Sequence, residues 1–197
     1  NAEIQSIIDN ADAPTFENVV EAYERSGAIL DRVVGVLFNL SETDGTESLQ
    51  KIVEQVLPLL SVHSDNIFMN PAFFAKVEVL YNDMENLGLN REQEMALKKL
   101  YDGFVKNGVA LGEAEQARMR EINMELSSLS NAFGNMLLAE NNAFAEEFGV
   151  AISEYGGAMA STDDRALRQK MFKAYASRGN NGNENDTKEL IMRMMTL

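Results

Sequence analysis

The stretch that decides the fold is EAEQARMREINMELSSLSNAFGNMLLAENN, residues 113–142. Its large apolar side chains recur every three or four positions, at Ile122, Leu126, Leu129, Phe133 and Leu137. This spacing is typical of one face of an α-helix that packs on antiparallel helical neighbours. A helix over this stretch extends about 45 Å at 1.5 Å per residue. The sequence therefore predicts an elongated multi-helix bundle.

The same helical spacing continues on both sides of this stretch. Local signals predict where several helices begin: Thr15 as an N-cap, Asn70 as the cap before Pro71, Asn90 with Gln93 as a capping box, and Ser161 with Asp164 as the start of a later helix. The apolar residues before residue 40 are expected to lie on one buried face; they are Phe16, Val19, Val20, Tyr23, Ile29, Leu30, Val33, Val34 and Leu37.

Breaks in the pattern divide the chain into helical segments. Polar or glycine-containing stretches at 41–46, 86–90, 107–112 and 179–186 predict turns or loops. Pro58 is expected to kink or divide the helix around it, since proline removes a backbone donor. No run of strand-like alternation occurs. The predicted fold class is all-α with seven to nine helices.

The predicted domain organisation has three parts. Residues 1–145 form an N-terminal helical domain. Residues 146–160, which include Gly149, Gly156 and Gly157, lack helical spacing and are expected to be irregular or shortened, as a gap or a deletion would leave them. Residues 161–197 begin a following helical region, in which Ile191, Met192, Met194 and Met195 resemble core residues without a partner to pack on.

The composition excludes several classes of function. The chain has 17 basic and 31 acidic side chains, a net charge of −14, so nucleic acid is not an expected partner. It has no cysteine, which excludes disulfides, thiolate metal sites and a cysteine nucleophile. No membrane span is expected, because no apolar run of about 18 residues occurs.

The single histidine is the first place to look for chemistry. His63 lies beside Ser61, Ser64 and Asp65 in SVHSDNIFMN, residues 61–70. A metal site needs several converging donors, and one histidine without cysteine leaves only carboxylates. The stretch NENDTKE at 183–189 lacks the central glycine of a calcium loop. We therefore predict no catalytic and no metal-ligating residue, and expect His63 to be partly buried and hydrogen-bonded locally at a helix end.

Four stretches of the chain resemble the M3 family of zinc metallopeptidases. They are PTFENVVEAYERSGAILDRVVGVLFNL at 14–40, HSDNIFMNPAFFAKVEVLY at 63–81, the region from LYDGFVKNG to NNAFA at 100–145, and DRALRQKMFKAYASRGNNGNENDTKELI at 164–191. They occur in the family order and cover about two-thirds of the chain. The third stretch is nearer to the peptidyl-dipeptidase (dipeptidyl carboxypeptidase) branch than to the oligopeptidase A branch.

The resemblance implies a function for a larger parent protein. The family carries zinc on an H-E-x-x-H helix in a catalytic half with a zincin-like fold, and this chain has no such motif. The chain would be the N-terminal helical half and would supply part of the wall of a channel that admits short peptides. The parent would hydrolyse such peptides, releasing C-terminal dipeptides, with one Zn²⁺. This chain alone would bind no zinc and be inactive without the missing C-terminal catalytic half.

The sequence leaves alternatives open. The chain could instead be a free-standing helical module that binds peptides or a partner protein through the apolar surface of its last helix. Substrate-binding residues cannot be assigned from the sequence. The compartment stays open between cytoplasm and periplasm, because family members occur in both.

Overall fold

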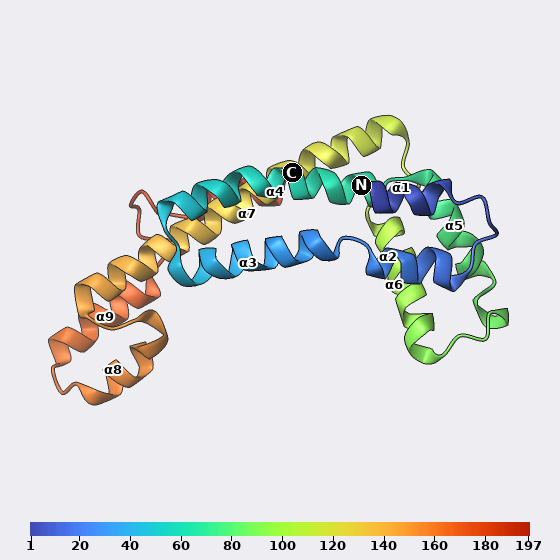
Figure 1. The fold of residues 1–197 in the computed structure, drawn as a ribbon. Coiled ribbons are helices and arrows are strands. Elements are labelled where there is room, and N and C mark those ends of the chain that lie inside the picture. The colour runs from blue at the N-terminus through green and yellow to red at the C-terminus, as the bar shows by residue number, and fades with distance from the viewer. The chain divides into compact units, whose positions relative to one another are not determined.

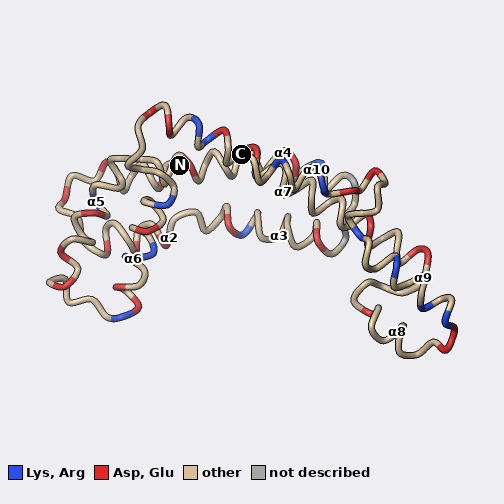
Figure 2. Tube along the Cα trace, turned by 180° about the vertical axis from the view of Figure 1, so that it is seen from behind, with Lys and Arg blue, Asp and Glu red and all other residues tan. Residues whose placement is uncertain are grey.

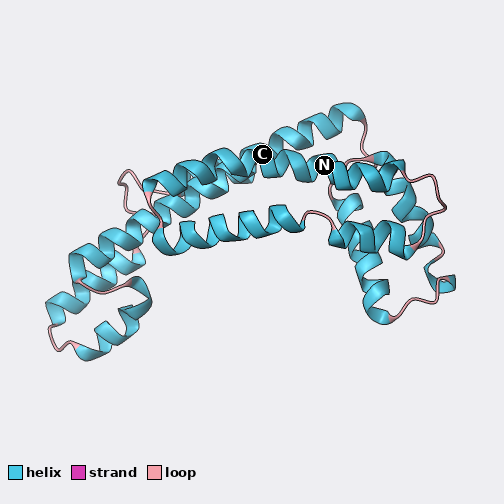
Figure 3. Ribbon diagram, in the orientation of Figure 1, coloured by secondary structure: helices cyan, strands magenta, loops and turns pink.

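The computed structural model describes the backbone of all 197 residues and the side chains of all except Asp44 and Glu47. Over this described backbone the chain is helical and contains no strand (Figure 3). Nine of the ten α-helical segments have seven or more residues, in agreement with the seven to nine helices expected. The all-α prediction is confirmed.

The chain divides into two compact units, residues Asn1–Met124 and Glu125–Leu197. We call them the first and the second unit. The first unit contains α1 (Ala2–Asp9), a π-helix (Phe16–Glu21) that continues into α2 (Ala22–Arg25), α3 (Ala28–Asp44), α4 (Glu47–Phe68), α5 (Pro71–Asn82), a 3-10 turn (Met84–Asn86), α6 (Arg91–Lys106) and the beginning of α7 (Glu113–Phe148). The second unit contains the rest of α7, a 3-10 turn (Ile152–Glu154), α8 (Tyr155–Ser161), α9 (Arg165–Ala176) and α10 (Lys188–Thr196).

Four of the predicted helix starts are confirmed, and each is encoded by a local hydrogen bond. The Thr15 hydroxyl accepts from the Asn18 N–H and the Asn18 side chain accepts from the Thr15 N–H, which makes a capping box. Asn70 caps α5 directly before Pro71. Asn90 and Gln93 form the second capping box, at the start of α6. Asp164 caps α9 through the N–H groups of its first turn. Ser161, also expected to start this helix, is instead the last residue of α8.

The core of the first unit is an aromatic and aliphatic cluster between α1, the π-helix, the end of α4, α5 and α6. Phe73 and Phe104 are fully buried, and their rings meet edge to face with centroids 5.1 Å apart. Phe68 contacts Phe104 at 5.3 Å between centroids. Such pairs add roughly 0.5–1.5 kcal/mol beyond the area they bury. The end of α4 is therefore fixed against the α5–α6 pair.

Helix α3 corrects one expectation. The sequence predicts one buried face through residue 37, but no described residue of α3 is buried. Ile29 is 80% exposed and Val33 is 60% exposed. The helix packs beside α4, the two joined by a turn at Gly45 and Thr46 (Figure 1). Helical spacing identifies a face but does not show whether a neighbour covers it.

Two predicted interruptions of the helical pattern are smaller in the structure than expected. Pro58 lies inside α4, which is one continuous helix, so the alternative in which it divides the helix is wrong, and a kink at Pro58 stays a prediction. The break expected at 41–46 is shorter, because α3 continues to Asp44.

Residues 146–160 are also mostly helical instead of irregular. Helix α7 continues to Phe148, and only residues 149–151 separate it from the 3-10 turn that leads into α8. The rings of Phe144, Phe148 and Tyr155 pack together across this connection. These ring contacts pack the glycine-rich segment against α7, and its sequence alone does not reveal this packing. The proposed domain boundaries at 145 and 160 stay predictions.

Candidate functional site

His63 lies on α4, more than a turn before the helix ends, and is half-buried. Its Nδ1 is 2.8 Å from the side-chain oxygen of Asn1. An amide oxygen only accepts, so Nδ1 is the donor in this contact. The prediction of partial burial is confirmed. The prediction of a local partner at a helix end is wrong, because Asn1 is 62 positions away in the chain.

The neighbouring polar residues of α4 hold helix α7 instead of forming a catalytic pair with His63. Asp65 is buried, and its carboxylate accepts a hydrogen bond of 2.8 Å from the Asn123 amide. Asn66 accepts one of 3.0 Å from Arg120. A buried carboxylate is costly unless it is hydrogen-bonded, so Asp65 and Asn123 stabilise one packing of the two helices. Their role is in the scaffold.

The described side chains do not fit a zinc site of the type that the resemblance implies. Among the side chains that the structure describes, no three from His, Cys, Asp and Glu converge as metal ligands would. The sequence supplies only one imidazole and no thiolate. Structural and catalytic zinc sites need at least three such donors.

The second unit contains a more elaborate polar site, the loop at 179–187 between α9 and α10. Glu140 of α7 is buried beneath this loop. One of its carboxylate oxygens accepts from the Asn181 amide and the other from the Asn183 amide, both at 2.6 Å. Thr187 is also buried, and both its hydroxyl and its N–H donate to the Gly179 carbonyl. The two ends of the loop are therefore bonded to each other, and its middle is bonded to α7.

Asp186 fixes the far side of the same loop. One carboxylate oxygen accepts from the Gly182 N–H and the other from the Lys188 N–H, each at 2.9 Å. The bond from Lys188 and then that from Gly182 hold the pKa of this carboxyl below its usual range. Asp186 is therefore ionised at neutral pH, at the start of α10.

A hollow of about 580 Å³ lies between this loop and α10. It is lined by Met136 of α7, loop residues, and charged side chains of both signs from α10. The residues that line it are Met136, Gly182, Asn183, Glu184, Asp186, Lys188, Glu189, Leu190 and Arg193. The wall is mostly polar and charged, and its two large apolar side chains are Met136 and Leu190.

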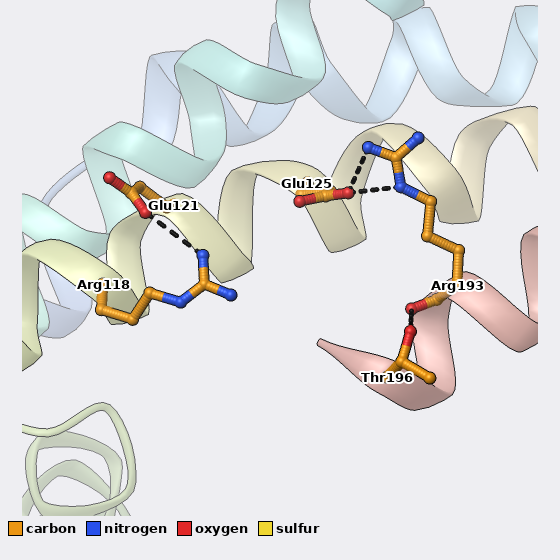
Figure 4. A network of polar contacts seen from close by, with 5 residues as sticks. All are labelled: Arg118, Glu121, Glu125, Arg193 and Thr196. Atoms are coloured by element: carbon orange, nitrogen blue, oxygen red, sulfur yellow. Dashed lines mark hydrogen bonds and ion pairs between the residues drawn. The ribbon is translucent and has the colours of Figure 1, made fainter.

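Helix α10 is tied to α7 by an ion pair at its other end. The Arg193 guanidinium contacts a Glu125 carboxylate oxygen through two nitrogens, each 2.5 Å away, and its carbonyl accepts from Thr196 (Figure 4). Arg118 and Glu121, both exposed, make a second pair one turn apart on α7 (Figure 4). Exposed pairs contribute at most about 1 kcal/mol, so the Arg193–Glu125 pair orients α10 more than it stabilises it.

Apolar side chains are exposed on α3 and on α10. On α3 they are Leu30 and a row spaced by four, three and four residues, Ile29, Val33, Val36 and Leu40. Charged residues are absent between Arg32 and Glu42, and Figure 2 shows this part of α3 in tan. On α10 the exposed residues are Ile191, Met192 and Met195. Spacing of this kind is the pattern that a second helix packs against.

No helix in the described part of the chain has the length and apolar content required to cross a bilayer. No protein-family model matches the sequence.

Curated proteins do match it along its whole length. The chain is 28% identical over 228 residues to dipeptidyl carboxypeptidase of Escherichia coli (strain K12), a match that covers 100% of this chain and 34% of that protein. The homologues are M3 family peptidases. The resemblance predicted from the four sequence stretches is confirmed.

Two further homologues show the same pattern. Dipeptidyl carboxypeptidase of Salmonella typhimurium is 29% identical over 99% of this chain and 33% of its own length. Oligopeptidase A of the same organism is 23% identical over 93% of this chain and 32% of its own length. The chain thus spans about a third of each relative, within the N-terminal part.

The length of the match concerns the segment at 146–160, which the sequence predicts to be irregular or shortened. The match to the Escherichia coli protein extends over 228 residues, whereas this chain has 197, so that relative has residues without a counterpart here. Their expected place, between Ala145 and Asp164, stays a prediction.

Proposed function

We propose that this chain is the N-terminal channel-wall domain of a zinc-dependent oligopeptidase of the M3 type. The full-length parent would hydrolyse short peptides and release C-terminal dipeptides. The observation that carries this proposal is the match over the entire chain to about a third of two dipeptidyl carboxypeptidases. Their identities, 28% and 29%, exceed the 23% to oligopeptidase A, which supports dipeptide release over internal cleavage.

The residue types of the chain support a parent protein in which the zinc chemistry is performed by a different part. The zinc, its ligands and the water-activating glutamate would lie in a catalytic half outside these 197 residues, since the chain has one histidine and no H-E-x-x-H. Zinc there would polarise the peptide carbonyl and activate water. The residues described here would shape access to that centre, and the apolar faces of α3 and α10 would contact other parts of the parent.

A peptidase assay tests the predicted inactivity of this chain. The purified protein is incubated with Zn²⁺ and a short fluorogenic peptide that has a free C-terminus, with and without a chelator. We expect no release of dipeptide above the rate without protein. Turnover that requires zinc and is lost in the chelator would refute the proposal. The variant His63→Ala is the matched control, because it removes the one imidazole that the chain could offer to zinc.

One observation favours a second candidate function. The exposed apolar residues of α10 and the adjoining hollow would suit a free-standing module that binds peptides or a partner protein. Light scattering separates the two readings: a stable homodimer that Met192→Lys and Met195→Lys together convert to a monomer supports the free-standing module. A monomer with this surface exposed supports a domain of a larger protein.

A further inference from the structure

The loop at 179–187 contains a chemically reactive pair, Asn181–Gly182. In an Asn-Gly pair the glycine nitrogen can attack the carbonyl carbon of the asparagine side chain, because glycine has no Cβ to block the approach. A bond forms between the Gly182 nitrogen and Cγ of Asn181, the Cγ–Nδ2 bond breaks, and ammonia leaves with the Gly182 proton. Water then opens the succinimide ring to aspartate or isoaspartate. Both residues are exposed, so water reaches them.

Two carboxylates hold this pair in the folded protein. Asn181 Nδ2, the nitrogen that would leave, donates to the buried Glu140 at 2.6 Å. The Gly182 nitrogen, which would attack, donates to Asp186 at 2.9 Å. Ring closure must break both hydrogen bonds and remove a proton beside a negative charge. The reaction is therefore slower in the folded loop than in an unfolded chain.

We propose that Asn181–Gly182 is a spontaneous deamidation site whose reaction releases the loop from α7. The product replaces an N–H donor with a carboxylate oxygen that faces the Glu140 carboxylate. Two carboxylates at hydrogen-bond distance repel strongly when one of them, Glu140, is buried. The modified residue 181 can therefore no longer bind Glu140. Loop residues line the hollow beside α10, and the modification would thereby alter that surface.

The chain supplies an internal comparison at Asn107–Gly108, which has the same two residue types. Gly108 is buried, its N–H donates to the Val105 carbonyl at 3.2 Å, and the Asn107 amide donates to the Gly103 carbonyl at 2.7 Å. Water has less access to this pair, at the end of α6. We therefore expect Asn107 to react more slowly than Asn181 in the folded protein.

The occurrence of the reaction is measured by mass spectrometry of peptides after incubation in warm, mildly alkaline buffer. In denaturant the two pairs should convert at similar rates. In the folded protein Asn181 should convert several-fold faster than Asn107. Asp186→Ala, which frees the Gly182 N–H, should raise the rate at Asn181 several-fold and leave Asn107 unchanged. Conversion of Asn107 that keeps pace with Asn181 in the folded protein, or no conversion of Asn181, overturns the proposal.

The consequence is tested by substitution. Asn181→Asp mimics one product, and Asn181→Ser removes the amide without adding charge. We expect Asn181→Asp to increase hydrogen exchange in residues 179–187 several-fold over Asn181→Ser, and Glu140→Gln to remove that difference. Equal exchange in the two variants, or a difference that persists with Glu140→Gln, shows that the charge does not release the loop.

Discussion

Phe104 is the residue whose truncation tests the core of the first unit most severely. Its side chain is fully buried, and its ring lies 5.1 Å from Phe73, 5.3 Å from Phe68 and 5.7 Å from Phe74 between centroids. Removing a buried phenylalanine ring costs about 3–5 kcal/mol, because transfer energy is lost and a cavity is left. Phe104→Ala should therefore lower the free energy of unfolding of this unit by about 4 kcal/mol.

The assay is urea denaturation followed by circular dichroism, with hydrogen exchange to show which helices lose protection. Phe104→Leu keeps most of the volume and should cost less than about 1.5 kcal/mol. The matched control is Phe172→Ala on α9, where the ring is 57% exposed and the same substitution should cost less than about 1 kcal/mol. A loss for Phe104→Ala no larger than that for Phe172→Ala would refute the packing described here.

Three further predictions follow from single contacts. Asn70→Ala removes the cap of α5 and should lower the free energy of unfolding, measured by urea denaturation, by about 1 kcal/mol. Asn70→Ser keeps a capping side chain and should restore most of this loss. A urea midpoint that Asn70→Ala leaves unchanged would contradict the capping role. Folding lowers the pKa of Asp186, so its ionised carboxylate stabilises the loop fully above the unfolded-state pKa. This stabilisation is lost as the pH falls through the folded-state pKa. Hydrogen exchange of Gly182 and Lys188 should therefore gain protection between acid and neutral pH, and a profile that Asp186→Asn leaves unchanged would disprove this. His63→Ala loses one partly exposed hydrogen bond to Asn1 and should cost about 1 kcal/mol; calorimetry should detect no specific Zn²⁺ binding in either protein, and binding that His63→Ala abolishes would show that the chain holds metal.

The features that the sequence predicts correctly are those encoded within a few residues. Thr15, Asn70, Asn90 and Asp164 each cap a helix through bonds to the next turn. Their geometry depends on local backbone, so a pattern of residue types is enough to identify them.

The features that it misses depend on distant partners. Asn1 bonds to His63 from 62 positions away, and Glu140 organises a loop that begins about forty positions later. The periodicity of α3 identifies its apolar face but gives no sign that Ile29 and Val33 are exposed. Pairings at this separation are determined by tertiary packing, and a single sequence gives no direct signal for them.

The polar sites also illustrate why residue type alone is a weak guide to chemistry. His63 is the residue that most resembles a catalytic group, and in the structure it bonds an asparagine. No sequence pattern identifies Glu140 as a special residue, yet it is buried and accepts two hydrogen bonds. Burial, which follows from the fold, distinguishes the two.

The most direct test of the account is to determine the protein that continues from this sequence in its source. Sequencing the transcript beyond the codon for Leu197 gives the answer without assumptions about folding or activity. The account predicts an open reading frame that continues into an H-E-x-x-H motif, at a total length near three times that of this chain, because the relatives are covered to about a third. A stop codon directly after Leu197, with no such motif encoded in frame, would contradict the proposal that this chain is part of a zinc peptidase.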